Sequence, residues 1–148
     1  MAINQLKTRV FVDADVLFAG AVSPSEHSAS LLVLQLAEIT LIDALTSQQV
    51  IIEAERNLTA KLPQALPAFR HLASRCLKIC PDPEPDDLLP YRGLANPKDL
   101  AILVAARREN CPWLVTFNLR HYVPGHPDVE VLKPGDFILR VRDQLALL

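Results

Sequence analysis

The chain has 148 residues, half of them hydrophobic, and a formal net charge of -2 at pH 7. This length suffices for one domain with a substantial core and is too short for two, and the apolar composition excludes a largely disordered protein. The near-neutral charge excludes the broad basic surface of a general nucleic-acid binder, although it allows a local basic rim beside an acidic centre.

Runs of β-branched residues alternate with segments of helical periodicity along the chain. In chain order we predict a strand at 9–12, helical turns at 16–21, a helix at 31–37, a strand at 40–45, helices at 48–62 and 66–75, a strand at 77–79, a helix from 96, strands at 113–116 and 129–132, and a helix at 137–147. This alternation predicts a three-layer α/β/α sandwich with a central parallel sheet, formed by a single domain over residues 1–148.

Residues that break or cap helices are expected to set several of these boundaries. Gly20 and the Ser23-Pro24 pair are expected to end the first helical turns, while Ser28 and Ser47 are expected to cap the two helices that follow them. Residues 81–87 contain three prolines and several acids, which favour an extended surface loop.

Polar side chains are predicted to gather at one end of the sheet. Ligands of open α/β sheets bind at the carboxyl ends of the strands, and helix starts adjoin those ends. Four of these residues follow the ends of strands: Asp13, Asp15, Thr116 and Asn118. Asp99 lies at the start of a helix, and Glu53 lies at the border of the apolar face of another helix.

Each acid also has a simpler interpretation when it is taken alone. Asp13 can cap the following helix, and Asp99 can be a favourable charge in a first helical turn. Together with Glu53, however, these carboxylates would repel one another unless a cation intervenes. Hard divalent ions such as Mg²⁺ and Mn²⁺ take oxygen ligands of this kind, and such a site can activate water against a phosphodiester. Thr116 and Asn118 would then orient a water or a phosphate oxygen.

Four segments carry a resemblance to a known family: residues 10–17, 47–58, 99–106 and 114–122. In order and spacing they are similar to the four motifs of the PIN-domain family of metal-dependent ribonucleases, and within it to a toxin-like bacterial branch. The resemblance implies that Asp13, Glu53 and Asp99 bind the metal, with Asp15 beside them. The fourth motif departs from the commonest form, because Asn118 stands where most members have an acid; one branch carries Asn there.

The same resemblance implies an RNA substrate, a partner antitoxin protein that blocks the site, and a homodimer built on leucine-rich helices. Two alternatives remain open. Asp13-Ala14-Asp15 also looks like the nucleophile motif of haloacid-dehalogenase phosphatases, in which Asp13 would attack phosphorus. Alternatively, the chain keeps the fold as a catalytically silent binding module, which the loss of an acid at Asn118 favours.

Other residues have ordinary expectations. We predict that Cys76, Cys80 and Cys111 are reduced and mostly buried, because they lack the partners of a zinc site. His121 is expected to be a surface or capping residue, and Trp113 to pack in the core. Neither a charged-then-apolar leader nor an apolar stretch of membrane-spanning length is evident, which predicts a cytoplasmic protein.

Overall fold

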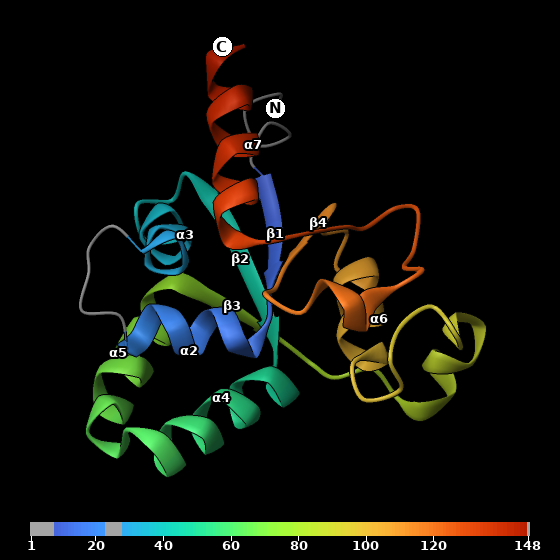
Figure 1. The fold of residues 1–148 in the computed structure, drawn as a ribbon, viewed down its shortest axis with the longest axis horizontal. Coiled ribbons are helices and arrows are strands. Elements are labelled where there is room, and N and C mark those ends of the chain that lie inside the picture. Colours follow the sequence, from blue (N-terminus) through green and yellow to red (C-terminus); the bar gives the residue numbers. More distant parts are fainter. Residues whose placement is uncertain (1–7, 23–27, 148) are drawn as a thin grey trace.

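The computed structural model describes residues 8–22 and 28–147. Within these ranges five strands form one parallel sheet in the order β3-β2-β1-β4-β5 (Figure 1). The strands are β1 (Thr8–Val12), β2 (Ile42–Ser47), β3 (Leu77–Cys80), β4 (Trp113–Val115) and β5 (Glu130–Leu132). The predicted α/β class is therefore confirmed, with β1 at the centre of the sheet.

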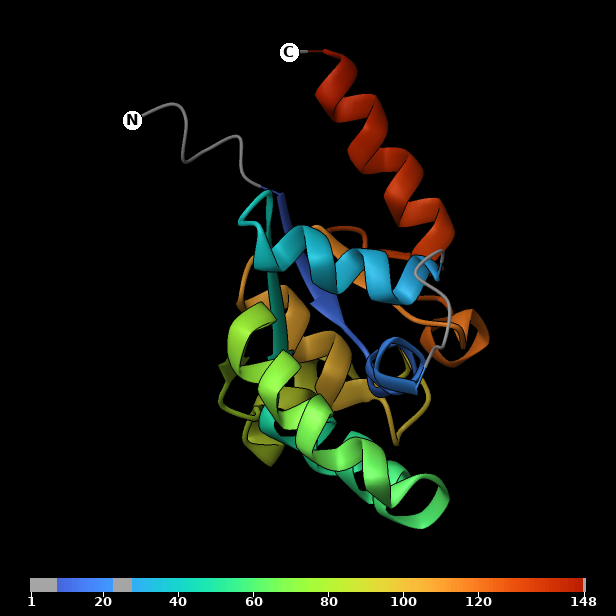
Figure 2. The ribbon, with the colours of Figure 1, turned by 90° about the vertical axis from the view of Figure 1, so that its left-hand side faces the viewer.

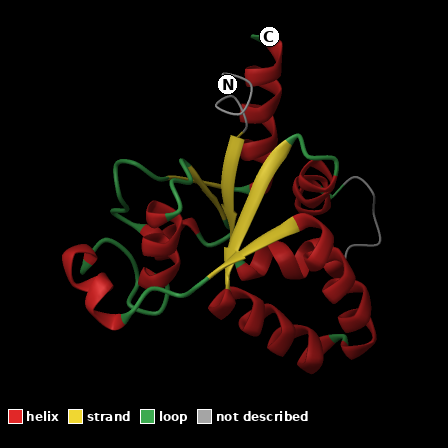
Figure 3. Cartoon of the chain, turned by 180° about the vertical axis from the view of Figure 1, so that it is seen from behind, coloured by secondary structure: helices red, strands yellow, loops and turns green. Residues whose placement is uncertain are grey.

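Helices cover the sheet on both sides, as the three-layer prediction requires. The helices are α2 (Ala14–Val22), α3 (Ala29–Glu38), α4 (Gln48–Lys61), α5 (Leu66–Cys76), α6 (Leu100–Arg108) and α7 (Pro134–Ala146), with 3-10 turns η1 (Pro63–Ala65), η2 (Pro85–Tyr91) and η3 (Leu119–Tyr122). Figures 1 and 2 show α3 on one side of β1 and β2 and α6 on the other. Seen from behind in Figure 3, the strands converge on the end where α4 begins.

The central strand explains why the sheet needs cover on both faces. Val10, Phe11 and Val12 are fully buried, so side chains pointing both ways from β1 lie in the core. Because a buried parallel strand leaves no polar face, continuous apolar runs are selected there instead of alternation. One face of α4 packs against this core through Val50, Ala54 and Leu58.

Short-range capping predictions are confirmed. The Ser28 hydroxyl accepts a hydrogen bond from the backbone N–H of Leu31, and Ser47 does the same for Val50. Both serines therefore satisfy a backbone donor that the first turn of a helix leaves unpaired.

The C-termini of α3 and α6 end in the same motif with different residues. Thr40 N–H donates to Ala37 O and Leu41 N–H donates to Leu36 O, the pattern of a Schellman cap. Thr40 adopts φ +64°, a left-handed conformation that a β-branched residue rarely takes. Asn110 occupies the matching position after α6 with φ +57°, which Asn tolerates better.

Several boundary predictions are wrong. The strand predicted at 40–45 is β2 at Ile42–Ser47, because Thr40 and Leu41 belong to the cap of α3. Gly20 does not end α2, which continues to Val22; it lies against α3, where a Cβ would approach Leu34 Cδ1 to 2.8 Å. The Ser23-Pro24 pair lies outside the described residues. Residues 81–84 form a loop as predicted, but from Pro85 the chain forms the 3-10 turn η2, because a proline suits the first position of a helix. For the same reason α7 begins at Pro134 and not at 137, whereas α6 begins only after Asp99.

The three cysteines are free and buried, as predicted. Trp113 is half-buried and packs edge-on against Phe137 with ring centroids 6.1 Å apart, which confirms its packing role. Among the described residues, none of the helices has the length and apolar character needed to cross a membrane.

Candidate functional site at the carboxyl ends of β1 and β4

The site lies where two central strands end side by side. The chain leaves β1 toward β2 on one side, whereas β4 leads to β5 on the other, and this divergence opens a crevice in parallel sheets. Asp13 N–H donates to Val115 O at 3.0 Å, which extends the pairing of β1 and β4 to the first acid. Thr116 follows β4 directly and is fully buried.

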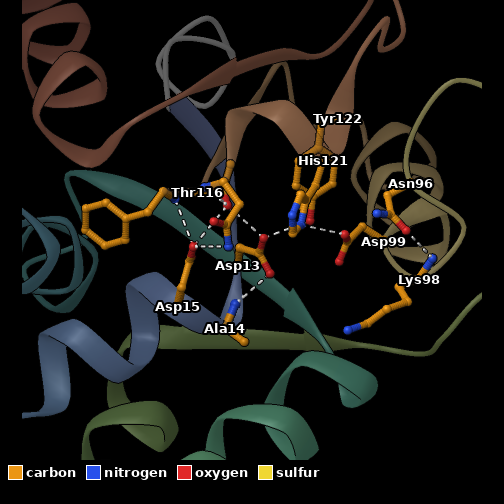
Figure 4. Close-up of polar contacts among 11 residues, drawn as sticks. Asp13, Ala14, Asp15, Asn96, Lys98, Asp99, Thr116, His121 and Tyr122 are labelled. Atoms are coloured by element: carbon orange, nitrogen blue, oxygen red, sulfur yellow. Dashed lines mark hydrogen bonds and ion pairs between the residues drawn. The ribbon is translucent and has the colours of Figure 1, made fainter.

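Asp13 is a buried carboxylate held by three hydrogen-bond donors (Figure 4). Ala14 N–H donates to Oδ1 at 2.7 Å, and the hydroxyls of Thr116 and Tyr122 donate to Oδ2 at 2.9 and 2.7 Å. Burying a carboxylate is costly unless such donors replace its water. The side chain is therefore fixed in place, and its predicted alternative as a helix cap does not account for the bonds from Thr116 and Tyr122.

Asp15 leans toward the exit of β4. Its Oδ2 accepts from Phe117 N–H at 3.0 Å and from Asn118 Nδ2 at 3.1 Å, and it lies 3.3 Å from the Thr116 hydroxyl oxygen, whose single proton is shared with the closer Asp13. Its Oδ1 is buried and has no hydrogen-bond partner among the described residues. Burial, together with the charge of Asp13, raises the pKa of Asp15 to about 6.

Thr116 and Asn118 act first on the acids themselves. The Thr116 hydroxyl lies within reach of both Asp13 and Asp15, and its oxygen accepts from the Asn118 backbone N–H at 3.1 Å. The Asn118 side chain is exposed and donates to Asp15. Both residues therefore orient carboxylates without adding negative charge.

Asp99 lies immediately before α6, at the N-cap position, but its side chain forms no capping hydrogen bond. Instead, Asp99 Oδ2 lies 3.0 Å from His121 Nδ1. Partial burial, with the charge of Asp13, raises the pKa of Asp99, whereas His121 acts in the opposite direction. The simpler interpretation of Asp99 as a first-turn charge does not explain this side-chain orientation.

Glu53 projects from α4 and is half-buried. Partial burial raises its pKa, and the charges of Asp13 and Asp99 raise it further. It makes no hydrogen bond or ion pair with another described residue. Three acids from separate parts of the chain are thus electrostatic neighbours. The positive charges of Lys98 and Arg56 act on the pKa of Glu53 in the opposite direction, but neither forms an ion pair with it within the described residues.

The donor chemistry fits a hard divalent ion held by few ligands. In the described parts of the chain, no three His, Cys, Asp or Glu side chains are already arranged as a cage for a metal. Mg²⁺ does not need such a cage, because it keeps several waters and is usually bound through one or two carboxylates plus substrate phosphates. The unpartnered Asp15 Oδ1 and the mutual effect of the acids on their pKa values are consistent with a cation between them.

Two neighbours of the acids were missed as site residues from the sequence. Tyr122 is buried with 2% exposure, and its pKa is raised by burial and by Asp13. His121, predicted as a surface or capping residue, is half-exposed as expected but lies against Asp99. Two sequence signals pointed to them: they follow a strand exit, a position that core and surface residues share, and they end the segment 114–122 that resembles the fourth family motif.

Known proteins resemble the chain in family and fold. A family model described as PIN domain matches residues 9–120. Among solved structures, VapBC2 from Rickettsia felis bound to a DNA fragment from their promoter contains a chain with 18% identity and a TM-score of 0.63, covering 84% of this chain and 98% of that one. PAE2754 from Pyrobaculum aerophilum has 19% identity and a TM-score of 0.63, covering 92% and 96%. Identities this low establish a shared fold alone, and no curated protein matches the chain.

Proposed function

Because the chain belongs to the PIN-domain family, whose members are generally nucleases, we propose that it is an endoribonuclease that depends on Mg²⁺ or Mn²⁺ and cleaves RNA phosphodiester bonds. The observation that carries this proposal is the placement of the acids at the carboxyl end of the sheet, where the charge of Asp13 raises the pKa values of both Glu53 and Asp99. We take residues 1–148 as one PIN-like domain. The family match over residues 9–120 includes Asp13-Ala14-Asp15, and it therefore favours the nuclease over the phosphatase alternative.

In this proposal Asp13, Glu53 and Asp99 hold the ion, and Asp15 supplies a further oxygen. The bound ion would supply the Lewis-acid stabilisation of charge that phosphodiester hydrolysis requires. The carboxylates bind and need not accept a proton. Thr116 and Asn118 keep Asp13 and Asp15 in orientation through the hydrogen bonds described above, and the neutral amide of Asn118 leaves one negative charge fewer than an acid would.

The test is RNA cleavage by the purified chain with Mn²⁺, with Mg²⁺ and with EDTA. Glu53→Gln removes one proposed ligand with little change in shape and should abolish metal-dependent cleavage. Glu55→Gln is the matched control, because Glu55 lies on the same helix and pairs with Arg70 at 3.2 Å, away from the acids. Equal cleavage by wild type and Glu53→Gln would refute the assignment.

We further propose that the chain is a cytoplasmic toxin of a toxin-antitoxin pair, neutralised by a partner protein and assembled as a homodimer. The fold shared with a chain of VapBC2 supports this at the level of family. Induced expression of the wild type should arrest bacterial growth, whereas Asp13→Asn should not. Light scattering of the purified chain tests the dimer, and a monomer at micromolar concentration would contradict it.

A catalytically silent binding module is the second candidate, and Asn118 favours it. In that case the acids would bind no ion and the protein would not cleave RNA in Mn²⁺. Asn118→Asp distinguishes the two functions, since an added carboxylate should change cleavage only where a metal is used.

A further inference from the structure

The turn η3 carries two consecutive residues to two different acids. The Tyr122 hydroxyl donates to Asp13 Oδ2 at 2.7 Å, and His121 Nδ1 lies 3.0 Å from Asp99 Oδ2. In Figure 4, His121 and Tyr122 stand between Asp13 and Asp99. Because Asp13 follows β1 and Asp99 precedes α6, this one turn links acids that arrive from separate elements.

The backbone holds the turn in place on both sides. His121 N–H donates to Asn118 O at 3.0 Å, which closes the turn itself, and Asn118 N–H donates to the Thr116 hydroxyl at 3.1 Å, which fixes the turn to the exit of β4. Asn96 N–H donates to His121 O at 2.7 Å, which fixes it to the approach to α6. Tyr122 is buried, so its ring has little freedom to rotate away. The turn therefore cannot shift without moving a strand end or the start of a helix.

The hydrogen bonds on Asp13 limit how it can meet an ion. Its two oxygens already accept from Ala14, Thr116 and Tyr122. Since an ionised carboxylate offers about four lone-pair sites, roughly one remains for a further contact. Removing one donor would let the carboxylate rotate, so that the remaining site is no longer directed.

We propose that η3 positions the metal-binding acids: the Tyr122 hydroxyl orients Asp13 and the His121 imidazole orients Asp99. This inference rests on the proposed function and deepens it. Neither residue is proposed to touch the ion or the RNA. Partners that orient a ligand in this way contribute to metal affinity through the ligand that they hold.

The principal variant is Tyr122→Phe, which removes only the hydroxyl. Its affinity for Mn²⁺, measured by calorimetry, should fall roughly 10-fold to 100-fold. At subsaturating Mn²⁺ the kcat for RNA should fall while KM for RNA stays unchanged. Tyr91→Phe is the matched control, because Tyr91 is half-buried and packs against His126 with ring centroids 5.7 Å apart, and its Mn²⁺ affinity should equal that of the wild type.

The His121 variants test the second part of the proposal, the orientation of Asp99, without disturbing a buried ring. His121→Asn keeps a donor close to the position of Nδ1 and should retain most of the Mn²⁺ affinity, whereas His121→Ala should lose it. The exposed His71 provides the control substitution, His71→Ala.

The outcomes separate the two proposals. A wild-type chain that neither binds Mn²⁺ nor cleaves RNA overturns the proposed function and this inference with it. A wild type that does both, with Tyr122→Phe within twofold of it in Mn²⁺ affinity, overturns the inference alone. If Tyr122→Phe does not fold, the decision passes to His121→Ala, and unchanged Mn²⁺ affinity in that variant overturns the proposed role of η3.

Discussion

Asp13→Asn gives the most direct test of how closely the acids are placed. The Oδ2 atoms of Asp13 and Asp15 lie 2.9 and 3.3 Å from the same Thr116 hydroxyl, so they are at most about 6 Å apart. At that separation two charges repel by about 3 kcal/mol at an effective dielectric constant of 20, and solvent beside the partly exposed Asp15 reduces this to about 1.5 kcal/mol. One pKa unit corresponds to about 1.4 kcal/mol.

The variant should therefore lower the pKa of Asp15 by about one unit, from about 6 to about 5. It should not restore the ordinary value of 3.8, because burial is the largest cause of the shift and remains in the variant. The pKa values of Glu53 and Asp99 should fall as well, since the charge of Asp13 raises both.

Titration of the carboxyl carbons by NMR between pH 3 and 8, in EDTA, measures these changes. Asp143→Asn serves as the control, because Asp143 is exposed near the end of α7 and pairs with Arg142. An Asp15 pKa that stays at about 6 in Asp13→Asn would refute the reasoning, since the two carboxylates would then not be neighbours. Loss of RNA cleavage in the same variant would be compatible with many causes, whereas the pKa of Asp15 responds to changes beside its carboxylate: the charge removed at Asp13 and the Thr116 hydroxyl that lies within reach of both acids.

Three further predictions concern stability. The raised pKa of Asp15 means that its proton stabilises the folded state fully below about pH 3.8, and that this contribution is lost as pH rises through about 6. In urea unfolding with EDTA, the loss of stability across this window should be about 1–2 kcal/mol smaller in Asp15→Asn than in the wild type, because only the contributions of Glu53 and Asp99 remain in the variant. An equal loss in both proteins would contradict the prediction. Thr40→Gly should raise the free energy of unfolding by about 1 kcal/mol, because glycine adopts φ +64° without strain, and Asn110→Gly should change it by less; a destabilised Thr40→Gly would show that the threonine is not strained. Gly20→Ala should lower the free energy of unfolding by about 1–2 kcal/mol, because the added Cβ would press on the buried Leu34. Gly135→Ala, with open space around it, should leave the stability unchanged or raise it slightly. Thermal melts of both variants test this difference.

Local patterns were sufficient to predict most of the framework. The buried run of β1 and the serine caps at Ser28 and Ser47 depend on residues within a few positions of one another, so the sequence displays their causes directly. The placement of Asp13 at a strand exit follows from the same run. The predicted meeting of Glu53 with Asp13 required one additional rule, that helices and strands of a parallel α/β sheet bring their ends to a common edge.

The errors arose where one residue type has two local meanings. Glycine ends many helices, but Gly20 lies inside α2 because Leu34, fourteen positions later, occupies the space that a side chain would need. Proline disfavours the interior of a helix but suits its first position, and Pro85 and Pro134 take the second role. In each case the role of the residue depends on the rest of the fold, either through a contact with a distant side chain or through the position at which a helix begins.

Tyr122 shows why a positioning residue is harder to find than a ligand. An acid at the end of a buried strand is easy to notice in a sequence, because burying its charge is costly unless a cation or hydrogen-bond donors compensate for the lost water. A tyrosine near a buried strand is not unusual, since its ring fits an apolar pattern wherever the hydroxyl points. Tyr122, with 2% exposure, is an ordinary core residue by this criterion. Its role depends on the direction of one oxygen toward Asp13, which is 109 positions away in the chain. Because that hydroxyl is buried, it must have a partner, and the nearest buried acceptor is the carboxylate that most needs a donor. The same reasoning applied to other buried tyrosines and threonines beside strand exits would identify orienting groups that motif comparison overlooks.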